Sequence, residues 1–163
     1  MITRPRVSVI ILLAIMNPKF FRIAATKTTD PAALGMLAGL ENLAQELATA
    51  EASFPERINA NKAKRGEKST KLPRRKAEEL KELEQDQIDI DQQVCEDFLK
   101  ADTPSQIVAS VSYALKQDIP TAKKFLKHYH PDDLPLGEEI FNLKEQLLEM
   151  VDAFLKRYPE NDG

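Results

Sequence analysis

Residues 127–133, with the sequence KHYHPDD, bring together the side chains of this chain that are best suited to metal binding or acid–base chemistry. His128 and His130 are two positions apart, and Asp132 and Asp133 follow them. Imidazole and carboxylate groups are common ligands of transition metals. Residues two apart on a helix face different directions, however, so the histidines can converge only where a helix ends between them. We favour a solvated helix terminus, with histidine near the negative end of the dipole and aspartate capping the next element, and we predict no metal site.

The other residue types that catalysis uses are poorly placed for it. Cys95 is the single cysteine, so the chain forms no internal disulfide, and more than thirty residues separate it from either histidine. It flanks a predicted helical seam, where a small buried side chain is more common than a nucleophile. The close glycine pair Gly35 and Gly39 lies in an apolar helical pattern, whereas phosphate-binding loops need glycines at a strand-to-helix turn. We therefore predict no cofactor and no enzymatic activity.

The strongest functional signal is a basic block that stands next to an acidic one. The net charge is only −3. Residues 57–76 nevertheless carry nine basic side chains against Glu67 alone, and residues 77–102 carry ten acidic side chains against two basic ones. Clustered lysine and arginine form a positive surface for phosphates. No aromatic residue lies between Phe54 and Phe98, so we expect contacts with the nucleic-acid backbone and little sequence specificity.

These observations predict a non-catalytic accessory or adaptor subunit that contacts nucleic acid through the basic block. The alternative is a protein-interaction module whose basic and acidic blocks mediate assembly with an acidic partner surface or with a second copy of the chain. A solvated loop without a partner is the interpretation without a function, and a metal-dependent enzyme at His128, His130 and Asp132 is the third functional one. The predicted phosphate-contacting residues are Lys62, Lys64, Arg65, Lys68, Lys71, Arg74, Arg75 and Lys76.

Two predicted helices position this block, within an all-α fold. Asp30 followed by Pro31 is typical of a helix start, and apolar residues then recur at spacings of three and four until Phe54–Pro55, where we expect a break or kink. A second helix, from about residue 77 to 99, continues the same period. Residues 29–101 are therefore predicted to form a long antiparallel, coiled-coil-like hairpin with a basic tip. The two seams are Ala33, Met36, Leu40, Leu43, Leu47, Ala50 and Phe54 in the first arm, and Leu80, Leu83, Gln87, Ile90, Val94 and Phe98 in the second.

Residues 102–163 are predicted to form a small C-terminal bundle of three helices. Thr103 and Gln106 are spaced as a capping box, with proline at the first helical position. Pro120 is expected to open a second, short helix, and the last helix is expected over about residues 136–158.

Residues 1–28 are predicted to form an apolar N-terminal strand or tail. Two arginines precede the apolar run at residues 7–16, which is the outline of a signal peptide, but Asn17 follows and no small-residue cleavage site is present. Ten apolar residues are too few to span a bilayer as a helix. We therefore expect a cytoplasmic protein that does not associate with membranes. For the apolar segment itself, the alternatives are an upstream extension before a start at Met16, or an export signal.

Overall fold

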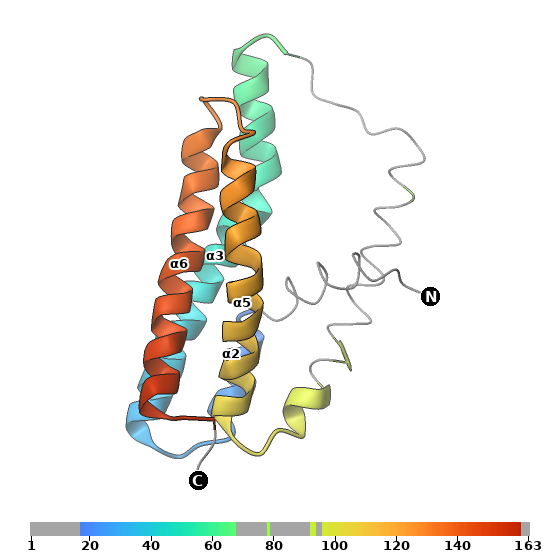
Figure 1. The fold of residues 1–163 in the computed structure, drawn as a ribbon. Coiled ribbons are helices and arrows are strands. Elements are labelled where there is room, and N and C mark those ends of the chain that lie inside the picture. The colour runs from blue at the N-terminus through green and yellow to red at the C-terminus, as the bar shows by residue number, and fades with distance from the viewer. Residues whose placement is uncertain (1–16, 68–77, 79–91, 94–95, 161–163) are drawn as a thin grey trace.

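The structure is a computed structural model, and it describes residues 17–67, 78, 92–93 and 96–160. The described residues form helices and connecting turns and contain no strand, which confirms the all-helical class. No helix among them is long and apolar enough to cross a membrane. The long helices run side by side, and a short one packs along two of them (Figure 1). They are α2 (Lys19–Ala25), α3 (Pro31–Lys64), α5 (Pro104–Leu126) and α6 (Leu134–Arg157).

Helix α3 begins where its sequence predicts. The Asp30 side chain accepts a hydrogen bond from the backbone N–H of Ala32 at 3.3 Å, and Pro31 occupies the first turn. The buried stripe differs from the predicted seam, because Met36 and Leu43 are only partly buried. Helix α3 packs against both α2 and α6, so its apolar face is turned toward two neighbours. That stripe consists of Ala33, Leu37, Leu40, Ala44, Leu47 and Ala50.

Neither internal proline ends its helix, so a break at Pro55 and a helix start at Pro120 are both wrong; the kink expected as the alternative at Pro55 stays a prediction. Helix α3 continues through Pro55 to Lys64, and α5 continues through Pro120 to Leu126. Both prolines are exposed, which keeps each ring away from the packed face. An internal proline costs about 3 kcal/mol. Packing of the flanking turns offsets this cost, and the segment predicted as two C-terminal helices is the single helix α5.

The predicted capping box at the start of α5 is confirmed. The backbone N–H of Gln106 donates to Thr103 Oγ1, and the backbone N–H of Thr103 donates to Gln106 Oε1, both at 3.3 Å. These two bonds satisfy donors that a helix N-terminus otherwise leaves without partners. Buried residues of α5 then include Ile107, Val111 and Leu115, which pack in the common core.

The N-terminal part of the described chain is a helix in the core. Residues 19–25, which the sequence assigned to a strand or tail, form α2, and its Phe20 and Phe21 are completely buried. The Phe20 ring meets the Phe98 ring edge-on, with centroids 5.1 Å apart. The apolar run at residues 7–16 lies outside the described residues.

The second arm of the predicted hairpin also lies mostly outside the described residues, so the hairpin and the domain boundary stay predictions. In the described part, α3 shares one hydrophobic core with α2, α5 and α6. Leu40 of α3 belongs to the same cluster as Val151 of α6. The C-terminal end of α3, where the basic block starts, lies against the turn between α5 and α6, because Asn61 bonds to Asp132 there.

Candidate functional site

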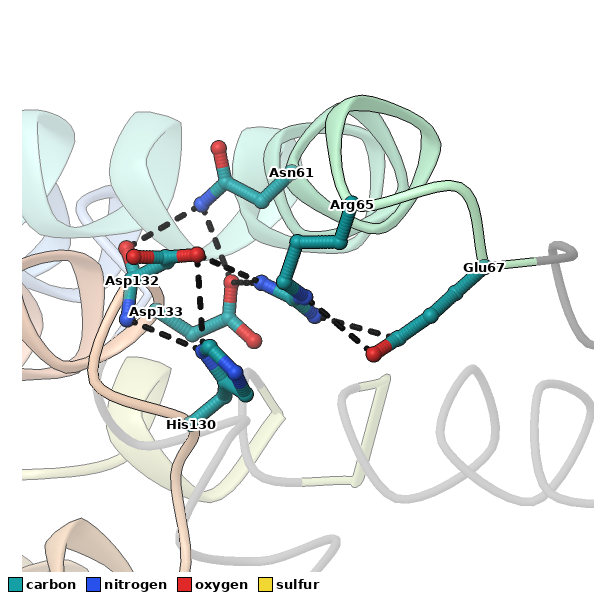
Figure 2. A network of polar contacts seen from close by, with 6 residues as sticks. All are labelled: Asn61, Arg65, Glu67, His130, Asp132 and Asp133. Atoms are coloured by element: carbon teal, nitrogen blue, oxygen red, sulfur yellow. Dashed lines mark hydrogen bonds and ion pairs between the residues drawn. The ribbon is translucent and has the colours of Figure 1, made fainter.

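The end of α3 is joined to the α5–α6 turn by a polar network (Figure 2). Asn61, on the last full turn of α3, donates from Nδ2 to the backbone oxygen of Asp132 at 3.2 Å and to Asp133 Oδ1 at 2.9 Å. Two turns before it, the ring of Phe54 packs against Tyr129, with centroids 5.7 Å apart. These contacts fix the start of the basic block relative to the bundle.

Arg65 is the centre of this network. Its guanidinium lies 3.2 Å from Glu67, 3.4 Å from Asp132 and 3.5 Å from Asp133, and only 15% of its side chain is exposed. Charge-assisted bonds of this kind are favourable for arginine because its planar fork matches carboxylate oxygens. The predicted phosphate contact at Arg65 would therefore have to compete with carboxylates that already pair with it.

Asp133 is the buried acid of the network, with 5% of its surface exposed. Its hydrogen bond from Asn61, together with the neighbouring Arg65 guanidinium, holds the pKa of the Asp133 carboxyl below its usual value. It also stands immediately before the first residue of α6, where the helix dipole favours a negative charge. This geometry indicates that Asp133 has a structural role and connects the end of α3 to the start of α6.

Removing the Asp133 carboxylate should destabilise the fold in a pH-dependent way. At neutral pH, Asp133→Ala is expected to lower the free energy of unfolding by about 1–2 kcal/mol, because one hydrogen bond and one ion pair to a buried carboxylate are lost. The folded-state pKa lies below the unfolded value of about 3.9, so this stabilisation is present above that value and disappears as the pH falls through the folded-state pKa. Urea unfolding at several pH values measures the difference. Asp132→Ala removes a largely exposed carboxylate and is the control, so it should lower the free energy of unfolding by less. If Asp133→Ala lost the same free energy at acidic and at neutral pH, the assignment would be contradicted.

The two histidines lie beyond the end of α5 and are exposed. Helix α5 ends at Leu126, and His128 and His130 belong to the turn that follows. His130 Nδ1 accepts a hydrogen bond from the backbone N–H of Asp132 at 3.1 Å and lies 3.5 Å from its carboxylate. Within the described ranges, no group of three or more histidine, cysteine, aspartate or glutamate side chains is arranged to hold a metal ion.

The structure places only part of the predicted basic surface. Lys64 is exposed at the last residue of α3, and Lys62, two residues earlier, is half-buried. Arg57, at the start of the basic block, pairs with Glu139 of α6 at 3.0 Å. The remaining predicted residues, Lys68, Lys71, Arg74, Arg75 and Lys76, lie outside the described residues.

A second basic cluster, which sequence reasoning missed, lies at the same end of the bundle. Lys123, Lys124 and Lys127 are exposed on the last turns of α5 and just beyond it. The C-terminal ends of α3 and α5 lie at the same end of the bundle in Figure 1, and the Asn61–Asp132 bond joins α3 to the turn that follows α5. The closely spaced lysines of α5 were visible in the sequence, but nothing local placed them near the basic block. The fold therefore gathers lysines from two segments about sixty residues apart.

Fold and site together define a class of protein: an all-helical bundle with lysine-rich segments at one end. No family model matches the chain, and neither the curated proteins nor the solved structures contain a significantly similar one.

Proposed function

We propose that this protein is a non-catalytic helical accessory or adaptor subunit that binds nucleic-acid phosphates at the end of the bundle where α3 and α5 terminate. The observation that supports the proposal most directly is the position of Lys123, Lys124 and Lys127, which lie at the same end as Lys64 and the start of the basic block. Lysines on separate segments can contact successive phosphates without needing base contacts.

The carboxylates at this end limit the interaction to strong polyanions. Asp132, Asp133 and Glu67 already surround Arg65, so the positive field there depends on the exposed lysines and on residues 68–76. Lysine ammonium groups act as point charges and are strongly hydrated. The proposed contact is therefore electrostatic, exchanges readily, and discriminates little between sequences.

Salt dependence provides the direct test of this proposal. The logarithm of the affinity for duplex DNA should fall linearly with the logarithm of the salt concentration, with a slope near −5 if about six phosphates are neutralised. Fluorescence anisotropy with two duplexes of equal length and unrelated sequence measures both slope and specificity, and single-stranded RNA of equal length compares the nucleic-acid types. A slope near zero, or a strong preference for one duplex, would contradict backbone binding; the absence of binding at low salt would remove the proposal.

A protein partner with an acidic surface is the second candidate. The Arg65 network favours a protein partner, because this residue of the basic block already pairs with the carboxylates of Asp132 and Asp133 in the α5–α6 turn. The acidic residues 77–102 could supply such a surface on a second copy. Light scattering at low and high salt would then show a salt-sensitive oligomer, and a pull-down would recover a partner whose association is insensitive to nuclease.

A further inference from the structure

The imidazole of His130 contacts two different groups of one residue, Asp132. Its Nδ1 atom accepts a hydrogen bond from the backbone N–H of Asp132 at 3.1 Å, and the same nitrogen lies 3.5 Å from the carboxylate oxygen Oδ2. A backbone N–H can only donate, so Nδ1 carries no proton in this arrangement, and a neutral ring then has its proton on Nε2. The structure therefore describes the uncharged state of His130.

Protonation of the ring reverses the role of Nδ1. An imidazolium carries a proton on both nitrogens and accepts no hydrogen bond. Nδ1 then has to give up the backbone N–H of Asp132, and the carboxylate of the same residue is an acceptor that already lies 3.5 Å away. The new bond is charge-assisted, which is the stronger kind. Histidine ordinarily changes charge between about pH 5 and 8, so the exchange of partners belongs to that range.

The backbone of the turn is held by bonds that do not involve the ring. The His130 carbonyl accepts hydrogen bonds from the backbone N–H groups of Asp133 at 2.8 Å and Leu134 at 3.0 Å. Asn61 donates to the Asp132 carbonyl from α3. Protonation of the imidazole leaves all of these bonds available, so the exchange can take place between side chains while the turn keeps its position.

The Asp132 carboxylate is also a partner of Arg65. Its Oδ2 atom lies 3.4 Å from Arg65 Nη1 and 3.5 Å from His130 Nδ1, so one oxygen faces both side chains (Figure 2). A neutral ring does not compete for this oxygen as a cation, whereas an imidazolium does. Protonation therefore weakens the pair between Arg65 and Asp132, while Glu67 and Asp133 remain near the guanidinium.

The charged groups that share this network keep their charge over the range in which His130 changes its own. The Arg65 hydrogen bond holds the pKa of the Glu67 carboxyl below its usual value, and the hydrogen bond from Asn61 does the same for Asp133. Both carboxylates therefore stay ionised above about pH 5. The network has two cations and three carboxylates, which are Lys62, Arg65, Glu67, Asp132 and Asp133.

We propose that His130 is a pH-dependent switch of the proposed nucleic-acid surface, and that its protonation strengthens the binding of phosphates there. The added proton cancels the excess of one negative charge in the network and turns the Asp132 carboxylate from Arg65 toward the imidazolium. The effect on binding rests on the proposed function. The exchange of partners at Asp132 is a property of the turn and needs no ligand.

NMR titration of the full chain between about pH 5.5 and 8 tests the exchange itself. The backbone amide of Asp132 and the Nε–H of Arg65 should shift with the same midpoint as the His130 ring. His130→Gln should abolish both shifts. His128→Gln is the matched control, because His128 is the other histidine of the chain and is exposed in the same turn, and it should leave both shifts unchanged. Shifts that persist in His130→Gln, or that follow a different midpoint, would overturn the switch.

Fluorescence anisotropy with one DNA duplex at fixed salt measures the effect on binding. The wild-type chain should bind at least about threefold more tightly near pH 5.5 than near pH 7.5, which corresponds to roughly one added phosphate contact. His130→Gln should lose this gain, and His128→Gln should keep most of it because the His130–Asp132 contact is intact.

The outcomes separate this inference from the proposed function. Duplex binding that is indifferent to pH, or an equal loss of the gain in the two variants, would refute the switch and leave the proposed function standing. Absence of binding at low salt at both pH values would remove the proposed function and the effect on binding together, and the NMR titration would still decide the exchange at Asp132.

Discussion

Replacing Phe20 by alanine is expected to lower the free energy of unfolding by about 3–5 kcal/mol, the range for a fully buried phenylalanine. The side chain has no exposed surface and packs against Phe98 as well as the α3–α6 core. Truncation leaves a cavity that the surrounding helices can fill only in part. Because small domains are stable by only about 5–15 kcal/mol, this single change should come close to unfolding the protein.

Chemical denaturation followed by circular dichroism measures this loss, and Leu99→Ala is the matched control. Leu99 is adjacent to Phe98 and 60% exposed, so its truncation should cost no more than about 0.5 kcal/mol. A double-mutant cycle between Phe20 and Phe98 should give a coupling of about 0.5–1.5 kcal/mol. A loss below about 1 kcal/mol for Phe20→Ala would mean that α2 is not part of the core.

Reversing three charges of the basic block should weaken nucleic-acid binding by more than about 100-fold at 0.1 M salt and leave the helix content unchanged. The change is Lys64→Glu, Lys68→Glu and Arg75→Glu in one chain. Each lost phosphate contact reduces the salt slope by about one, and the introduced carboxylates repel the polyanion. Arg65 is left intact because its reversal would also break the network with Asp132 and Asp133. Anisotropy titrations over a range of salt measure the effect.

A control with the same change in total charge isolates the contribution of location. Lys100, Lys116 and Lys156 are exposed and lie outside the basic block and the lysines at the end of α5, so their combined reversal to glutamate should have a much smaller effect. Reversing Lys123, Lys124 and Lys127 tests whether α5 contributes to the same surface. If the basic-block variant binds nucleic acid normally but loses a nuclease-insensitive complex, the protein-interaction alternative replaces the proposal; no change in either property would withdraw both.

Several elements of the fold could be read from local sequence because their causes are local. Asp30–Pro31 and the Thr103–Gln106 box specify helix starts through hydrogen bonds within a single turn. The apolar period of three and four residues specifies the helices, although the face that α3 buries differs from the predicted seam at Met36 and Leu43. The sequence also identified the basic block itself, since charge composition requires no fold to be counted.

At several positions, the tertiary structure overrode the conformation that the local sequence prefers. Pro55 and Pro120 remain within helices because packing on both sides offsets the local cost, and the Phe20–Phe21 pair becomes buried in a helix because it can pack on α3 and α5. The pairing of Arg65 with Asp132, and the approach of the α5 lysines to the basic block through the Asn61–Asp132 bond, depend on residues more than sixty positions apart. Sequence alone determines which segments prefer to be helical, because that preference arises within a turn; only packing determines which charged side chains meet, because those partners come from distant parts of the chain.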